Sequence, residues 1–399
     1  MLLYCNIGYV YSQKIFHGIV TDTANNALVG VTIQNVSTNS KTITNNAGQF
    51  ETTIEKYPTI ITFSFIGFKK DTISIKSEAD YESVKNIVLS VSVTNLPPVI
   101  LTGAKDLVRL AVEKAVRHAG DFYYGKAVYR QFEKQKNELI GFKELYLNAK
   151  WFCGMTKGIN IESARYAHLD KGSIQANIIN NSSPSYALSG YAGSVGQYHN
   201  PLTLQSKNRF DFEIKDYVDY GNETVAIIRC TPKNREKDKV YFNGDIYIGT
   251  TSYCVYKIDG FYKGDNILAH TGAKGGAPGG EKDVKLSVVS YFNKNSDSLV
   301  VFDNSTIVLS YKYKIGFVTI FTGSVTSKFY ISEYSEELSK KHYIDVDSPS
   351  ADESEIKKQV PYDPIFWKNP PSIPYTAEES LLLKDLEKQK KVTGTLFQK

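Results

Sequence analysis

The sequence predicts a mostly β protein, in which a small β-sandwich domain precedes a larger antiparallel β domain with a few helices. Tyrosine and phenylalanine are frequent in the 399-residue chain, at 28 and 20 residues, and aromatic side chains suit the half-buried surface of a sheet. Short runs of alternating apolar and polar residues recur through the N-terminal quarter and again in the second half. Alternation of this kind, interrupted by turn residues, is typical of antiparallel β structure.

The domain organisation follows from changes in this pattern along the chain. A chain of this length is expected to form two domains with separate cores. The expected division is a signal-peptide remnant at 1–12, a β-sandwich at 14–101, a helical linker at 102–125, an antiparallel β domain at 126–335 and an extended tail with a C-terminal helix at 336–399.

The first twelve residues carry no charge and are mostly apolar. Ser12 is a small residue at a suitable cleavage point, so this segment is interpreted as the end of a secretory signal peptide. The alternative is a first strand of the core. No later apolar run is long enough for a transmembrane helix, which needs about 20 residues. We therefore expect an exported protein, located in the periplasm or associated with the outer membrane or cell surface.

The N-terminal domain shows the β pattern most clearly. Val29, Val31 and Ile33 alternate with polar or small residues, and Gly48 lies where a tight turn needs a positive φ. About seven short strands at regular spacing predict a sandwich.

The order of motifs in this domain resembles the carboxypeptidase-regulatory-like domain of exported Bacteroidetes-type proteins. The motifs are Gly18-x-Val20-x-Asp22, Leu28-Val-Gly-Val-Thr-Ile33, Thr44-Asn-Asn-Ala-Gly48-Gln-Phe50, Ile61-Thr-Phe-Ser-Phe-Ile-Gly67-Phe68 and the closing Leu96-Pro-Pro-Val-Ile100. Ala27 stands where the family usually has proline, which loosens one turn. The resemblance implies a transthyretin-like or prealbumin-like sandwich, also described as a carbohydrate-binding-like fold, which often precedes TonB-dependent receptors. It implies an accessory domain without peptidase activity.

The rest of the chain returns to strands after an amphipathic helix at 104–119, for which Gly120 is a suitable C-terminal cap. The segments 225–232, 244–248 and 253–258 are similar to outer-membrane lipoprotein-carrier folds, which implies a half-barrel around an apolar groove. An ordinary solid β core is the alternative. Strands are expected at 127–133, 139–152, 224–232, 245–249, 252–258, 284–292, 299–302, 307–313, 318–324 and 327–334.

Motifs for catalysis, metals and cofactors are missing from the sequence. None of the six histidines belongs to a His-Glu-x-x-His motif, and no Gly-x-Ser-x-Gly motif occurs. The glycine-rich run 272–280 lacks the Gly-Lys-Ser/Thr ending of a phosphate-binding loop. Cys230 and Cys254 lie on neighbouring expected strands, where two buried thiols are favoured and a disulfide is the alternative. The net charge of +5 is spread along the chain, so no nucleic-acid partner is expected.

Two groups of aromatic residues are candidate contacts for a ligand or partner. Tyr186, Tyr191 and Tyr198 belong to a segment rich in Ser, Asn and Gly, where their rings could stack on a sugar or simply pack. Phe366 and Trp367 are the aromatic anchor of the tail, and could either pin it to the body or dock a partner.

The leading hypothesis is a non-enzymatic protein of the cell envelope that binds or scaffolds an unknown protein or glycan, without cofactor. It could act with an outer-membrane uptake system. One alternative is an exported hydrolase, most plausibly a peptidase, with the sandwich as an accessory domain. Another is a carrier of an apolar ligand in a half-barrel groove.

Overall fold

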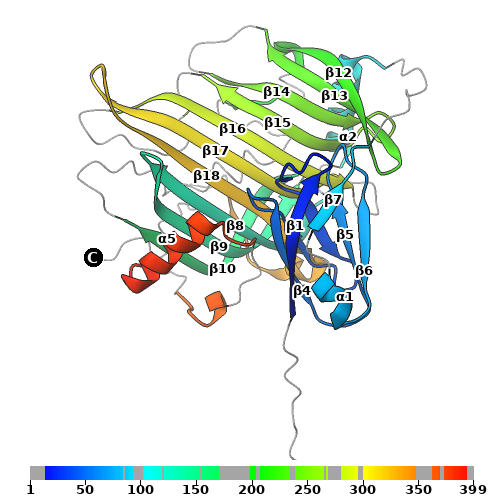
Figure 1. Ribbon diagram of the computed structural model, residues 1–399. Helices are drawn as coiled ribbons and strands as arrows, with labels where there is room; N and C mark the ends of the chain where they lie inside the picture. Colours follow the sequence, from blue (N-terminus) through cyan, green and yellow to red (C-terminus); the bar gives the residue numbers. More distant parts are fainter. Residues whose placement is uncertain are drawn as a thin grey trace, which may run out of the picture.

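The protein consists of a sandwich and a large curved sheet (Figure 1). The computed structural model describes residues 14–83, 86–92, 102–118, 121–152, 154–169, 198–203, 207–233, 239–264, 267, 280–294, 300–346, 362–368 and 373–392. Strands predominate throughout these residues, which confirms the mostly β fold class.

The N-terminal domain is the expected seven-stranded sandwich. Its strands are β1 (Lys14–Asp22), β2 (Thr32–Asn35), β3 (Lys41–Ile43), β4 (Gln49–Ile54), β5 (Thr59–Ser64), β6 (Asp71–Ile75) and β7 (Asn86–Leu89), with a short helix α1 (Glu78–Ser83) before β7. They form a three-stranded sheet in the order β4-β1-β7 and a four-stranded sheet in the order β3-β2-β5-β6. Phe16, Phe50 and Phe63 fill the core between these sheets. The closing strand expected at 96–100 lies outside the described residues.

Gly48 illustrates why the turns of this domain have their sequence. Its φ is +72°, and a Cβ atom built on it would lie 2.6 Å from the backbone oxygen of Val20. Only glycine combines that backbone conformation with so close an approach.

The second domain is built on one twelve-stranded, mostly antiparallel sheet. Eleven strands follow the order β12-β13-β14-β15-β16-β17-β18-β8-β9-β10-β19, and β11 pairs with β14. They are β8 (Tyr123–Gln135), β9 (Glu138–Phe152), β10 (Met155–His168), β11 (Tyr198–His199), β12 (Phe210–Tyr220), β13 (Glu223–Pro232), β14 (Val240–Gly249), β15 (Val255–Lys263), β16 (Gly280–Lys294), β17 (Val300–Ile315), β18 (Val318–Tyr334) and β19 (Ile344–Asp345).

Several strand predictions need correction. The segments 299–302 and 307–313 are not separate strands but parts of β17, and 318–324 and 327–334 are both parts of β18. Asp303 and Asn304 lie in the gap between two of the expected strands, but they are buried within β17 where the sandwich covers it. The expected strands also left out β10 and β12.

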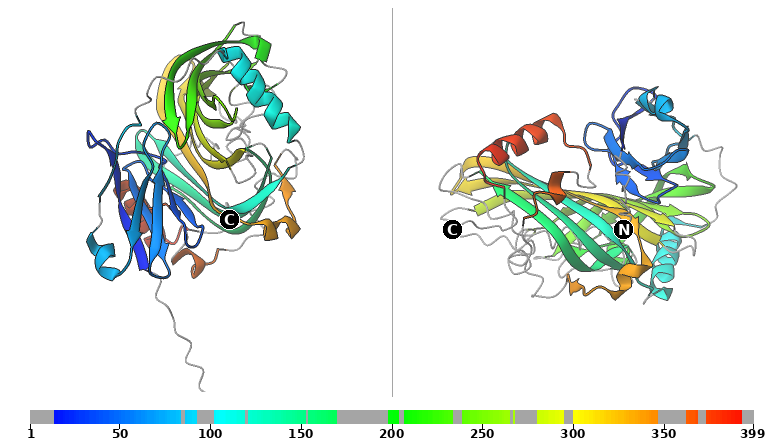
Figure 2. Two further views of the ribbon diagram at one scale, coloured as in Figure 1. Left: turned by 90° about the vertical axis from the view of Figure 1, so that its right-hand side faces the viewer. Right: turned by 90° about the horizontal axis from the view of Figure 1, so that it is seen from below.

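The helix α2 (Ala104–Arg117) is part of the core of the second domain. It ends at Arg117 with His118 as its cap, earlier than expected, and Gly120 lies outside the described residues. Leu107, Val108 and Val112 are buried in the main apolar cluster, so the helix packs on the sheet that follows it. Figure 2 shows α2 on one side of the curved sheet and the sandwich on the other.

The face of the sheet that carries α2 is packed as a core. Trp151 is fully buried and its ring lies 5.6 Å from that of Tyr123, 6.2 Å from Phe302 and 6.2 Å from Phe329, measured between centroids. The sheet is curved and open, but the apolar side chains described on this face are covered.

The C-terminal helix α5 (Ala377–Lys388) lies on the opposite face. Thr376 and Glu379 form the capping box that starts it, and Leu382, Leu383 and Leu386 pack on Phe132 and Phe142. No helix in the described part of the chain is both long and apolar enough to cross a membrane.

The two cysteines of the large sheet are separate thiols. Cys230 and Cys254 are both buried and unbridged, and burial raises the pKa of Cys230 well above its ordinary value. Because alkylating reagents attack the exposed thiolate, we expect neither residue to be modified by iodoacetamide in the native protein. Peptide mass spectrometry after labelling in buffer and in denaturant would check this. Rapid native labelling of Cys230 would contradict it.

Candidate functional site

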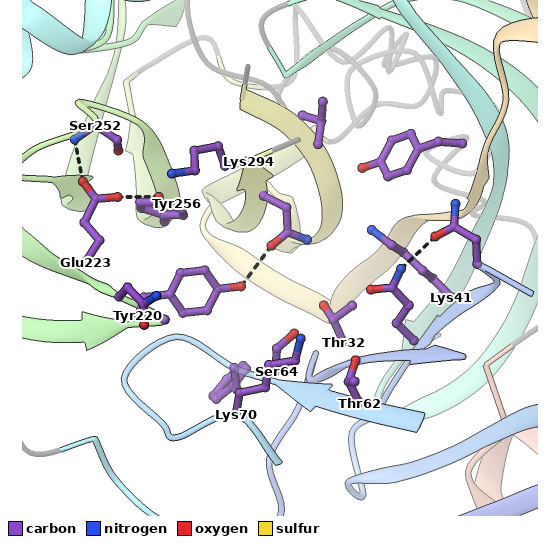
Figure 3. A pocket seen from close by; sticks show the side chains of 18 of the residues that line it. Thr32, Lys41, Thr62, Ser64, Lys70, Tyr220, Glu223, Ser252, Tyr256 and Lys294 are labelled. Carbon is purple, nitrogen blue, oxygen red and sulfur yellow. Dashed lines mark hydrogen bonds between the residues drawn. The ribbon is translucent and has the colours of Figure 1, made fainter. Parts of the chain in front are cut away.

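A cleft of about 990 Å³ lies between the sandwich and the large sheet. The sandwich contributes β2, β3, β5 and the turn after β5, and the sheet contributes the ends of β8, β16 and β18 with the β12–β13 and β14–β15 turns. Figure 3 shows Thr32, Lys41 and Ser64 on the sandwich side. Pockets of about 300–1,000 Å³ are typical of small-ligand sites, so the cleft is the candidate functional site.

Asp303 fixes one end of the cleft by joining the two domains. It is 3% exposed, and its carboxylate accepts a hydrogen bond from the Thr32 hydroxyl. The Lys41 ammonium lies 3.6 Å from the same carboxylate and 4.6 Å above the ring of Tyr334. A buried ion pair of this kind orients both side chains, so Lys41 is held in place at this end of the cleft.

Tyr220 joins the domains at the other end. Its hydroxyl donates to the Asn293 side chain at 2.9 Å and also bonds to Ser64 of the sandwich. Burial and the nearby Asp303 raise the pKa of Tyr220, so the hydroxyl stays protonated at neutral pH. Phe65 packs on Tyr291 at a centroid distance of 5.6 Å. The two walls are therefore positioned by direct contacts.

Glu223 shapes the far wall. Its carboxylate accepts hydrogen bonds from the Tyr256 hydroxyl at 2.6 Å and from the backbone amides of Ser252 at 2.6 Å and Thr251 at 3.1 Å. Burial alone would raise the pKa of Glu223, but these hydrogen bonds outweigh it and the pKa lies below its ordinary value. Glu223 is thus an ionised acceptor that ties the β14–β15 turn to β13.

The open side of the cleft carries free hydrogen-bonding groups beside aromatic rings. Lys70 and Lys294 are exposed and form no ion pair with any residue that the structure describes. Phe65, Phe68 and Tyr124 supply partly exposed ring faces nearby. Such a surface can pack against the C–H face of a ring while amino, amide and hydroxyl groups bond to its oxygens.

Residues 16–101 match the family model of the CarboxypepD_reg-like domain. This match confirms the resemblance seen in the motifs between Gly18 and Phe68. No curated protein matches the chain.

Solved structures were also compared with the whole chain. A putative outer membrane lipoprotein-sorting protein domain from Vibrio parahaemolyticus is 10% identical, with 57% of this chain and 91% of that chain covered and a TM-score of 0.26. A LolA superfamily protein from Nitrosomonas europaea is 9% identical, with 60% and 98% covered and a TM-score of 0.21. A putative membrane-associated protein of unknown function from Bacteroides fragilis is 10% identical, with 81% and 99% covered and a TM-score of 0.15.

None of the aromatic residues singled out from the sequence is among the described residues that line the cleft. Tyr186 and Tyr191 lie outside the described residues. Tyr198 is in β11, where its backbone pairs with that of Val240. Phe366 and Trp367 lie on the opposite side of β9 and β10 from the core: the Phe366 ring is 5.2 Å from Tyr146, and Trp367 is 6% exposed beneath Arg165.

The cleft residues themselves could not be recognised in the sequence. They come from turns and strand ends on both sides of the boundary of the CarboxypepD_reg-like domain. In the sequence, none of them differs from an ordinary turn or strand residue. One weak signal exists, the pairing of lysines with aromatics in Phe68-Lys69-Lys70. Within the described ranges, no three His, Cys, Asp or Glu side chains are grouped closely enough to hold a metal ion.

Proposed function

We propose that this protein is a non-enzymatic binding protein of the bacterial cell envelope, and that the cleft between the CarboxypepD_reg-like domain and the large sheet binds a glycan chain. The observation that carries the proposal is the composition of the cleft wall. Partly exposed rings lie beside the exposed ammonium groups of Lys70 and Lys294, which form no ion pair within the described residues. This arrangement suits a ligand with apolar ring faces and many hydroxyl groups.

Two carboxylates at the cleft are bonded to the protein itself, which supports binding more than catalysis, and the exposed Glu336 also lines the cleft. Glu223 is engaged by three donors, and Asp303 is engaged by Thr32 and Lys41. A general base or nucleophile needs an oxygen directed at the substrate, whereas these carboxylates are directed at the protein. We therefore assign them to the support of the cleft.

An apolar carrier is the less favoured candidate. A groove for an acyl chain requires apolar side chains that a ligand can reach. Trp151, Phe302 and Phe329 on the α2 face are at most 1% exposed, which supports a site outside the sheet core. The envelope location rests on the uncharged, apolar segment 1–12 and on the exported proteins in which this kind of domain is common. Association with an outer-membrane uptake system is part of the same proposal, and a pull-down from detergent-solubilised envelope would test it.

The binding proposal is tested with the full chain and a panel of neutral and acidic oligosaccharides, measured by isothermal titration calorimetry. We expect at least one acidic member to bind, and Lys70→Ala with Lys294→Ala to weaken that binding about tenfold, which is roughly 1.4 kcal/mol. Lys69→Ala is the matched control, because Lys69 is an exposed neighbour that does not line the cleft. The control should leave the affinity unchanged.

Three outcomes would overturn the proposal. Binding of peptides with no binding of any oligosaccharide would replace the glycan by a peptide. Equal weakening by Lys69→Ala would move the site away from the cleft. Shortened oligosaccharides, detected by mass spectrometry after incubation with the protein, would show hydrolysis and favour the alternative of an exported hydrolase.

A further inference from the structure

The hairpin between β17 and β18 ends in an exposed apolar tip. Phe317 is 104% exposed, the highest value among the large apolar side chains in the described part of the chain, and Val318 is 64% exposed. Ile315 and Ile320 are each 39% exposed. Isolated apolar side chains are common on protein surfaces, but four within six residues form a patch that calls for an explanation.

The tip extends beyond its neighbours in the sheet. The pairing of β18 with β8 begins at Gly323 and Gln135, and the pairing of β17 with β16 ends at Lys314 and Gly280. Among the described residues, the strand pairing of this tip is therefore confined to the β17–β18 hairpin itself, where Ile315 pairs with Val318 and Lys314 with Thr319. Figure 1 shows this hairpin projecting at the upper left, past the β8–β9 hairpin.

The hairpin has an uncharged tip, residues 315–320, and a charged neck that contains Lys312 and Lys314. No charged residue occurs from 315 to 327. Directly behind the tip, Lys312 and Lys314 lie on the same side of β17, and their ammonium groups are 3.1 and 3.2 Å from the single carboxylate of Asp283. Two cations share one anion, so the neck keeps an excess positive charge. The rings of Tyr313 and Phe321 stack at 5.1 Å across the two strands and stiffen the hairpin there.

We propose that this tip inserts into the surface of an anionic lipid bilayer and that Lys312 and Lys314 then lie at the lipid phosphates. Phe317 lies three positions after Lys314, in the turn, and this length of chain spans at most about 10 Å. Interfacial protein segments insert to about 5–10 Å. The apolar part of the hairpin thus has the length that this position requires.

A bilayer fits the tip better than a protein partner does. A stable protein interface buries about 800 Å² on each side, and one hairpin turn with four apolar side chains offers far less. A bilayer needs no complementary shape, because apolar side chains are transferred into it individually. The inference is independent of the glycan proposal, because the tip and the cleft share no residue.

The test is co-sedimentation of the full chain with vesicles of phosphatidylethanolamine and phosphatidylglycerol. We expect the wild type to bind, and Phe317→Ser with Val318→Ser to lower the partition coefficient at least tenfold. The matched control is Val36→Ser with Ile60→Ser, two apolar residues of the sandwich that are 52% and 43% exposed. It should bind like the wild type. Lys312→Gln with Lys314→Gln should weaken binding to these vesicles and leave the weaker binding to neutral phosphatidylcholine vesicles unchanged.

A fluorescence measurement reports insertion directly. The only tryptophans are Trp151 and Trp367, which are 0% and 6% exposed, so Phe317→Trp adds the one exposed tryptophan, which can be excited selectively at the red edge of the absorption band. We expect its emission to shift to the blue when vesicles are added, and the emission of Val36→Trp to stay constant. Wild-type protein that remains in solution with vesicles would overturn the proposal. So would equal losses in the tip and control variants, or self-association that the tip variant abolishes.

Discussion

Replacing Glu144 by alanine is expected to lower the free energy of unfolding by about 3–5 kcal/mol, the range found when one partner of a buried ion pair is removed. Glu144 is fully buried in β9, and its carboxylate accepts from Arg130 Nε at 2.5 Å and from Arg165 Nε at 2.7 Å. The Tyr375 hydroxyl donates to the same carboxylate. Without Glu144, the buried guanidinium of Arg130 would lose this ion pair, and that of Arg165 would keep only the longer pair with Glu387 at 4.0 Å.

Urea denaturation measures this effect, and limited proteolysis reports its location. Tyr375 precedes α5 directly, so we expect the C-terminal segment of the variant to be cleaved before the rest of the chain. The control is Glu378→Ala, which removes an exposed pair with Lys134 and should change stability by less than about 1 kcal/mol. Similar stability of both variants would show that the buried cluster contributes nothing beyond an ordinary surface pair.

Ionisation of Glu144 makes the free energy of unfolding depend on pH, and stability decreases as the pH falls. Burial alone would raise the pKa of Glu144, but Arg130, Arg165 and Tyr375 outweigh it and lower the pKa to about 2. A carboxyl whose pKa is depressed on folding stabilises the protein above its ordinary pKa of 4.5, and this contribution is lost as the pH falls from 4.5 to 2. The stability of wild type and Glu144→Ala should therefore converge in acid.

Replacing Asp303 by alanine is the second substitution with a large expected effect, about 3 kcal/mol. It removes the carboxylate to which both Thr32 and Lys41 of the sandwich are bonded. The Lys41 side chain is 9% exposed and would keep only its contact with the Tyr334 ring, so its charge would be poorly compensated. We expect the sandwich to separate from the sheet, so that the cleft loses the wall to which Thr32 and Lys41 belong.

Two measurements distinguish separation of the domains from general instability. Small-angle X-ray scattering should show a larger radius of gyration, and urea denaturation should change from one transition to two. Thr32→Val removes one hydrogen bond to this carboxylate but keeps the ion pair with Lys41. It should lower stability by about 1.5–3 kcal/mol without expanding the molecule. An Asp303→Ala variant with wild-type dimensions and a single transition would show that other contacts suffice to hold the domains together.

The sequence predicted the sandwich well because its signals are local. Alternating apolar residues define each short strand, and Gly48 defines a turn whose geometry excludes other residues. The fold class of the second part was also predictable, since long strands such as β9 and β16 still carry recognisable alternation.

The large sheet was predicted less well where another part of the protein covers it. Asp303 and Asn304 look like a turn in the sequence, but they are mid-strand residues whose side chains face the sandwich. The ion cluster of Glu144 and the cleft around Lys41 depend on residues far apart in the chain. Nothing in their local sequence indicates the partners, because long-range charge pairing leaves no periodic pattern.

The order of strands has a consequence for the assembly of the chain. β8 is among the first strands of the large sheet to be synthesised, yet one of its two neighbours is β18, where Tyr334 pairs with Gly125. Until β18 has been synthesised, one edge of β8 has no strand partner, although β8 lies in the middle of the finished sheet. Unpaired strand edges can pair with other chains. A nascent or truncated chain that stops before β18 should therefore need a chaperone to remain monomeric, and long-range closure of this kind is slow.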